Sequence, residues 1–135
     1  MKELQVLSLL LIMLFTLTAC QNGLLNAEQQ AADKIVLYQM ESFGQVKENT
    51  NYEITDKQTI KLFATAISRA NKVSGVADVV DPNFKVEFGE KEFYLWMAED
   101  HGSVMDVADD YTLYTLEQKD VEQLYSFLSS ENLLD

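Results

Sequence analysis

FKVEFGEKEFYLWMA, residues 84–98, is the stretch of this chain that decides the fold. Its first five residues alternate apolar and charged side chains, which is typical of a strand with one buried face. Gly89-Glu90-Lys91 then has the composition of a tight turn. Residues 93–98 are apolar on both faces, with Phe93, Leu95 and Met97 on one side and Tyr94, Trp96 and Ala98 on the other. The stretch therefore predicts an antiparallel hairpin whose second strand lies centrally in a sheet.

Four further runs rich in β-branched and aromatic residues predict strands on either side of this hairpin. They cover residues 34–43, 51–55, 104–107 and 111–116. Gly44, the turn Glu99-Asp100-His101-Gly102 and the pair Asp109-Asp110 separate them from their neighbours. The hairpin spacing from residue 84 to residue 116 indicates a largely antiparallel sheet.

Two helices are predicted from the recurrence of apolar residues on one face. The first begins at Thr55 or Asp56, where Thr55 and Gln58 have the spacing of a capping box, and Gly75 is its expected stop. Its buried face comprises Ile60, Phe63, Ala64, Ile67 and Ala70, and Arg69 and Lys72 near its end suit the helix dipole. The second helix is opened by Thr115 with Gln118, and its inward face comprises Val121, Leu124, Tyr125 and Leu128. The fold class is therefore α+β, with a largely antiparallel sheet and two helices packed on one face.

The N-terminus has the features of a bacterial lipoprotein signal. Residues 6–15 are apolar except for Ser8, and Leu17-Thr18-Ala19-Cys20 then forms a lipobox around the only cysteine of the sequence. An uncleaved membrane-spanning helix needs about 20 apolar residues, and the interrupted run from residue 4 to residue 19 is shorter. We expect a signal peptide at 1–19, lipid attachment at Cys20, a polar tether over 20–33 and one globular domain at 34–130. The Ala and Gln content of the tether could also form a short helix. The lipid would hold the protein on the outer face of the bacterial cell membrane.

The charge of the chain excludes a class of partners. It carries 22 acidic and 10 basic residues among 135, for a net charge of −12. A nucleic-acid-binding protein neutralises phosphates with clustered Lys and Arg, and no such cluster occurs here. The acidity favours solubility and repulsion from an anionic envelope, and its other interpretation is attraction of cations or of a basic partner.

The sequence offers two weak chemical sites in its acidic turns. His101 with Ser103 and either Asp100 or Asp106 has the residue types of a hydrolase, but neighbours this close alternate between the faces of an extended chain. Glu99, Asp100, Asp106, Asp109 and Asp110 offer oxygen ligands for Ca²⁺ without the spacing of a calcium loop. Solvated turns are the simpler interpretation of both. We expect no catalytic residues, no metal and no cofactor.

Three aromatic residues are the candidate interaction face. Tyr94, Trp96 and Tyr114 have the parity to share one face of the sheet if their strands are neighbours. An exposed cluster of this kind would form a binding surface, because aromatic side chains dominate interface energetics. The alternative is that the three side chains cover the second side of the sheet.

Short matches along the second half of the chain resemble the YhfM-like family of small lipoproteins from Bacillus and its relatives. They are Leu95-Trp96, Gly102-Ser103, Met105-Asp106, Asp109 and Thr112-Leu113-Tyr114-Thr115, and the likeness extends roughly from Ile35 to Leu128. Many members read Asp-Thr-His where this chain has Asp110-Tyr111-Thr112, so one histidine is missing. The resemblance implies a Gram-positive envelope lipoprotein and supplies no activity.

Together these features predict a non-enzymatic binding or interaction module held at the cell surface. A Ca²⁺-responsive envelope domain that uses the acidic turns at 99–110 is the first alternative. A hydrolase of unrecognised type is the second.

Overall fold

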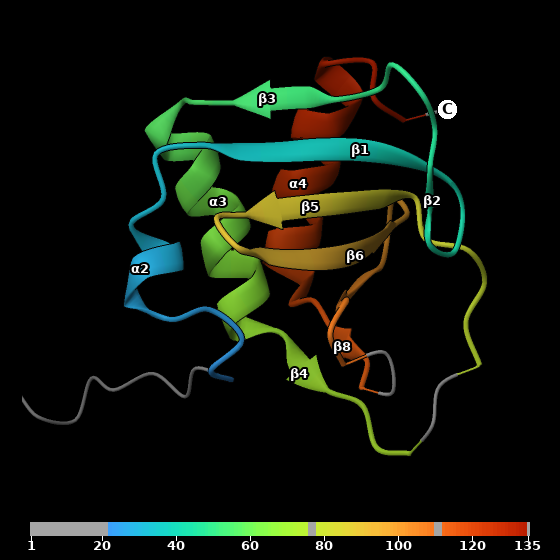
Figure 1. Cartoon of the computed structure of the whole chain (residues 1–135). Coiled ribbons are helices and arrows are strands. Elements are labelled where there is room, and N and C mark those ends of the chain that lie inside the picture. The colour runs from blue at the N-terminus through green and yellow to red at the C-terminus, as the bar shows by residue number, and fades with distance from the viewer. Residues whose placement is uncertain (1–21, 76–77, 110–111, 135) are drawn as a thin grey trace, which may run out of the picture.

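The computed structural model describes residues 22–75, 78–109 and 112–134, and it has the predicted α+β architecture (Figure 1). The helices are α2 (Ala27–Gln30), α3 (Lys57–Arg69) and α4 (Gln118–Ser130). The strands are β1 (Ile35–Ser42), β2 (Gln45–Val46), β3 (Tyr52–Ile54), β4 (Asn71–Lys72), β5 (Phe84–Phe88), β6 (Lys91–Met97), β7 (Gly102–Asp106) and β8 (Tyr114–Thr115). Both long helices, α3 and α4, lie on the same face of the sheet (Figure 1).

The described strands form one antiparallel sheet of eight strands. Its order is β2-β1-β5-β6-β7-β8-β4, and β3 pairs with β1 beside β2. The β5–β6 hairpin pairs Phe84 with Leu95 and Phe88 with Lys91, and its turn places Gly89 at a φ of 60°. That backbone conformation suits glycine, since it has no Cβ to clash. The hairpin and the central position of β6 confirm the prediction from residues 84–98.

The main core lies between the sheet and the helices α3 and α4. Apolar side chains that alternate along β1, β5 and β6 face inward, and α3 and α4 contribute the predicted apolar stripes. Phe63 and Leu124 are among the largest fully buried side chains of the core. Burial of such side chains contributes about 1.5–3 kcal/mol each, so this layer supplies most of the stabilising free energy.

The helix ends agree with the predicted ones in part. The N-cap of α3 is Asp56, one of the two predicted starts, and its carboxylate accepts a hydrogen bond from the Thr59 backbone N–H at 2.9 Å. The helix ends at Arg69 instead of Gly75, because the chain turns at Ala70 into the short strand β4. Helix α4 begins after Glu117 without a side-chain cap, so the predicted Thr115–Gln118 capping box is wrong.

The described part of the predicted tether is packed against the domain. Leu24 and Leu25 are buried in the main core, and α2 begins with a capping box between Asn26 and Gln29. The polar composition of residues 20–33 suggested a spacer, but two leucines in it can displace water from the core edge. Thus Leu24, Leu25 and Ala32 pack against the main core, and this part of the chain is not a free spacer.

Residues 1–21, and with them Cys20 and the predicted signal peptide, lie outside the described residues. Across the ranges that are described, no helix has both the length and the apolar character needed to span a bilayer.

Candidate functional site

A small second cluster of apolar residues lies on the face of the sheet opposite the long helices. It consists of Tyr94, Trp96 and Met105, and Tyr94 and Trp96 keep only 8% and 9% of their surface exposed. The ring of Phe43 lies against both aromatic rings, with centroids 5.5 Å from Tyr94 and 5.8 Å from Trp96. Phe43 itself remains 41% exposed. The cluster thus has a buried base and one exposed aromatic side chain.

Two hydrogen bonds hold surrounding loops over this cluster. The Trp96 indole Nε1 donates to the Val80 carbonyl oxygen at 2.8 Å, and the Phe43 backbone N–H donates to Asp81 Oδ1 at 3.0 Å. These bonds bring the β1–β2 turn and the segment before β5 to the same side of β6. Val80 is 79% exposed beside them. We call Phe43, Val80, Tyr94 and Trp96 the aromatic patch.

The edge of the aromatic patch is acidic. The segment before β5 contributes Asp78 and Asp81, both with exposed side chains, and Asp81 bonds to the Phe43 backbone. Residues 41–46 and 78–83 contain no Lys or Arg. The patch therefore presents exposed apolar side chains within a negatively charged border, which suits a basic partner.

The predicted grouping of Tyr94, Trp96 and Tyr114 is wrong for Tyr114. Strand β8 pairs with β7, where Tyr114 lies opposite Val104, and Val104 in turn lies opposite Leu95. Paired residues share a face, so Tyr114 lies on the helix side and packs against the main core. Tyr94 and Trp96 do share a face, and they cover the second side of the sheet, as the alternative interpretation proposed for all three residues.

The sequence analysis missed the two exposed members of the aromatic patch. Phe43 precedes Gly44 in a turn, and Val80 lies in an irregular segment, so neither follows the periodicity that identifies strands and helices. The position of Phe43 at the end of the predicted strand 34–43, directly before Gly44, was the available signal.

Beside the aromatic patch, the outer face of the sheet carries a network of paired charges. Lys85 Nζ lies 2.8 Å from Glu92 Oε2 and 4.9 Å from the centroid of the Tyr38 ring. The Tyr38 hydroxyl donates to Glu87 at 3.3 Å. Burial by itself lowers the pKa of Lys85, but the hydrogen bond to Glu92 and the nearby carboxylates outweigh it and raise that pKa above its usual value. The lysine remains charged and paired, so it is no candidate for a general base.

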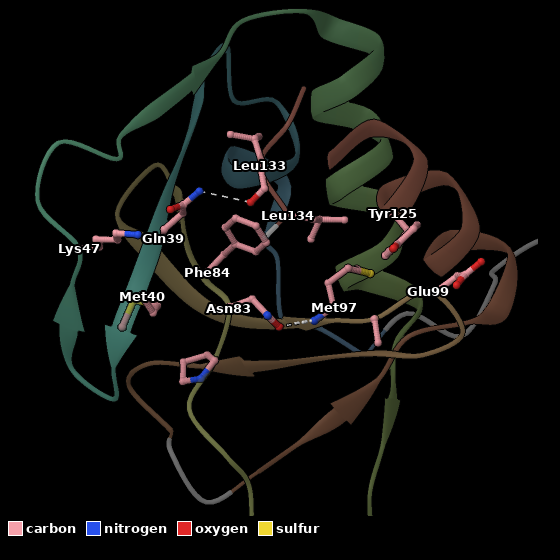
Figure 2. Close-up of a pocket in the computed structure, with 12 residues that line it drawn as sticks. Gln39, Met40, Lys47, Asn83, Phe84, Met97, Glu99, Tyr125, Leu133 and Leu134 are labelled. Carbon is pink, nitrogen blue, oxygen red and sulfur yellow. Dashed lines mark hydrogen bonds between the residues drawn. The ribbon is translucent and has the colours of Figure 1, made fainter. Parts of the chain in front are cut away.

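A groove of about 400 Å³ lies between the ends of β1, β5 and β6 and the C-terminal segment (Figure 2). Gln39 Nε2 donates to the Leu133 carbonyl at 3.3 Å, and Asn83 Oδ1 accepts from the Met97 backbone N–H at 2.8 Å (Figure 2). Both amide side chains that line the groove therefore bond to the backbone. Lys47 and Glu99 supply its charged groups, and no His or Cys lines it. The groove holds none of the side-chain pairs that general acid–base or nucleophilic catalysis requires.

The structure does not assemble the hydrolase set. His101 Nδ1 lies 2.7 Å from Asp100 Oδ1, and both side chains are exposed. The hydrogen bond from His101 lowers the pKa of Asp100. His101 forms no hydrogen bond with Ser103 or Asp106 in the described chain. Without a bond from base to nucleophile the set lacks the geometry of a triad.

The acidic residues at 99–110 are divided between the two ends of β7. Glu99 and Asp100 precede the strand, whereas Asp106 ends it, where its carboxylate lies 3.1 Å from Lys91 Nζ. Four strand residues, 102–105, at about 3.3 Å each lie between the two groups. Asp110 lies outside the described residues. In the parts of the chain that are described, no three His, Cys, Asp or Glu side chains are grouped closely enough to hold a metal ion.

Comparison with known proteins identifies one family. The family model described as YhfM protein matches residues 28–133, which include every described strand, both long helices and all groove-lining residues except Leu134. A search of curated proteins and a search of solved structures found no match.

Proposed function

The chain belongs to the YhfM family, and on that basis we propose that it is a lipid-anchored protein of the bacterial cell surface that binds another envelope protein and catalyses no reaction. Its lipobox supports the location, since cleavage before Cys20 would leave a lipidated N-terminus. The aromatic patch is its binding surface. The observation that carries the proposal is the exposure of Phe43 over the rings of Tyr94 and Trp96.

An exposed aromatic side chain on a rigid base is suited to binding. Apolar residues that are accessible and contiguous mark interaction sites, and aromatic residues supply a large share of interface free energy. Tyr94 and Trp96 limit the motion of Phe43, so a partner loses little additional side-chain entropy when it covers the ring. The acidic border formed by Asp78 and Asp81 favours a protein that presents an apolar side chain flanked by Lys or Arg.

The chemistry of the other candidate sites supports a role without catalysis. His101 pairs with an exposed Asp100 instead of a nucleophile, and Lys85 is held by Glu92. The groove in Figure 2 contributes amides that already bond to the backbone. A binding surface is therefore a simpler account of these residues than an active site.

The anchoring half of the proposal is tested by Cys20→Ala. The unmodified chain should fractionate with membranes in its processed form, and the variant should remain unprocessed or be released. Equal processing and equal membrane retention of the two chains would contradict lipid anchoring.

The binding half is tested by crosslinking on intact cells followed by purification of the lipidated protein. The double variant Phe43→Ser, Val80→Ser removes both exposed side chains and retains the backbone groups that bond to Asp81 and Trp96. The control, Gln58→Ser with Glu122→Ser, changes two exposed positions on the helices. A specific envelope protein should be captured by the unmodified chain and by the control, and its recovery should fall at least tenfold with the patch variant.

Equal recovery with the patch variant and the control would exclude the aromatic patch as the binding surface. Absence of any specific capture would contradict the interaction-module proposal itself. The captured protein, once purified, should bind more weakly as salt rises, because the acidic border acts through screened charges.

A further inference from the structure

We infer that the face formed by residues 22–25 and the C-terminal end of α3 lies directly against the lipid headgroups, so that the anchor holds the domain in one orientation. This inference rests on the proposed lipidation of Cys20. It adds the surface that meets the bilayer and the direction in which the aromatic patch points.

Asn22 binds the end of α3 with three hydrogen bonds and makes a fourth within its own segment. Its backbone N–H donates to the Ser68 carbonyl at 3.1 Å, and its Nδ2 donates to the carbonyls of Ile67 at 2.7 Å and Ala70 at 3.0 Å. Its Oδ1 accepts from the Leu24 backbone N–H at 2.9 Å. The last carbonyls of a helix have no partner within that helix, so Asn22 satisfies groups that would otherwise need water.

Burial and a charged group hold the next residues. Leu24 and Leu25 enter the main core, and Lys91 Nζ donates to the Leu24 carbonyl oxygen at 2.6 Å. Lys91 begins β6, the central strand, so this bond ties the segment to the most strongly paired part of the sheet. The chain is thus attached to the rigid domain from Asn22 onward.

The length of chain between the lipid and this attachment is very short. Only Gln21 separates Cys20 from Asn22. Two residues span at most about 7 Å even when fully extended. The headgroup layer on each side of a bilayer is about 5–7 Å thick. A lipid on Cys20 therefore places Asn22, and with it the end of α3, at the surface of the bilayer.

The charge of this end of the domain is compatible with a lipid surface. Residues 67–72 contain Arg69 and Lys72 and no acidic residue, although the chain has a net charge of −12. Of the neighbouring acids, Asp106 and Asp120 are paired with Lys91 and Arg69, and the exposed Glu117 accepts a hydrogen bond from Asn71 Nδ2 at 2.7 Å. Anionic lipids would repel the more acidic remainder of the domain, which favours the same orientation.

This orientation leaves the aromatic patch accessible. Ile35 at the start of β1 pairs with Phe88, and Phe88 pairs with Lys91, which holds the anchored segment. Phe43 follows the other end of β1, a strand of eight residues and about 26 Å. Figure 1 shows α2 and the β1–β2 turn at opposite ends of β1.

The test compares two single-cysteine labels on the lipidated protein in vesicles that contain phosphatidylglycerol. Lys72→Cys lies just beyond the anchored end of α3, and Lys57→Cys lies at its other end. The helix of 13 residues separates the two positions by about 20 Å. The thioether consumes the thiol of Cys20, so each introduced thiol is the only one available for a fluorophore. A headgroup-bound quencher should reduce emission at residue 72 at least twofold more than at residue 57.

A second variant, with twelve Gly and Ser residues inserted between Gln21 and Asn22, provides the control. Such a linker reaches about 19 Å, comparable with the length of α3, so the difference between the two labels should disappear while membrane fractionation persists. Equal quenching of both labels on the uninserted protein would overturn the inference and leave the lipid anchor intact. A difference that survives the insertion would also overturn it, because the orientation would then not come from the short attachment. Failure of the uninserted protein to bind vesicles would instead contradict the proposed anchoring.

Discussion

Arg69 at the end of α3 binds Asp120 in the first turn of α4 through two hydrogen bonds, with Nη2 2.7 Å from Oδ1 and Nε 3.2 Å from Oδ2. The paired geometry of a guanidinium and a carboxylate is among the strongest in proteins. Asp120 is only 1% exposed, whereas Arg69 stays accessible to water. The pair thus joins the two long helices at the end of the domain that holds Asn22.

Arg69→Ala should lower the free energy of unfolding by on the order of 2 kcal/mol, because it leaves a buried carboxylate without a partner. Replacing both members by Arg69→Met and Asp120→Leu should recover part of this loss, since no charge then remains buried. Urea unfolding monitored by circular dichroism measures both values. If the double variant is less stable than Arg69→Ala, the ion pair must stabilise the fold by more than neutralising the buried Asp120 carboxylate.

Asp56 should contribute to stability only above the acidic range. The hydrogen bond from the Thr59 side chain, followed by that from its backbone, lowers the pKa of Asp56 below its usual value of 3.8. A carboxylate with a lowered pKa in the folded state stabilises the fold above its unfolded pKa and loses this contribution as the pH falls through the folded pKa. The difference in unfolding midpoint between the unmodified chain and Asp56→Asn should therefore be full at pH 6 and shrink below pH 4. If the difference in unfolding midpoint is the same at pH 2.5 as at pH 6, the negative charge of Asp56 does not stabilise the fold.

Leu25→Ala should destabilise the domain by about 3 kcal/mol, the usual scale for truncating a buried leucine. Glu28→Ala, at an exposed position in α2, is the matched control and should change the unfolding midpoint little. A chain that starts at residue 34 should be less stable than one that starts at residue 22. Equal stability of these two chains would show that residues 22–33 contact the domain but do not contribute to its free energy of unfolding.

Gly102→Ala should destabilise the fold by about 1–2 kcal/mol through overpacking. A Cβ at this position would lie 3.0 Å from Leu116 Cδ1, 3.2 Å from Met97 Cε and 3.3 Å from the Trp96 carbonyl oxygen. Adding Leu116→Val removes the nearest side-chain contact, so the double variant should lose less than the sum of the single variants. If the losses of stability of the two single variants simply add in the double variant, the contact of the new Cβ with the Trp96 carbonyl oxygen is the dominant one.

Local patterns predicted the elements whose side chains alternate or recur regularly. The faces of β6 and the buried stripes of α3 and α4 follow directly from residue spacing, because one side of each element meets the main core. The helix starts were less determined, since Thr55 and Asp56 are both good caps and only packing selects between them. The strand that contains Tyr114 is two residues long, and a shift of one residue reverses the face of every side chain.

The parts of the candidate site that sequence did not reveal depend on contacts between distant segments. Asn22 binds backbone carbonyls of α3, which every residue type provides, so no side-chain pattern indicates the pairing. Phe43 becomes part of the aromatic patch because the segment containing Asp81 returns to bond its backbone. The polar composition of residues 20–33 predicted a tether, and it did not reveal that Leu24 and Leu25 enter the main core.

The loops that cover Tyr94 and Trp96 have a kinetic consequence. The Trp96–Val80 and Phe43–Asp81 bonds hold these loops, whereas Phe93 and Leu95 lie within the paired strands beneath α3 and α4. In deuterated solvent, the Trp96 indole and Phe43 amide hydrogens should exchange through local opening, and the β6 amides should exchange only when the whole domain unfolds. A partner that covers the outer face would slow exchange of the Trp96 indole and Phe43 amide hydrogens and leave the β6 amides unchanged. Binding at this face could therefore be detected from the exchange rates of individual residues.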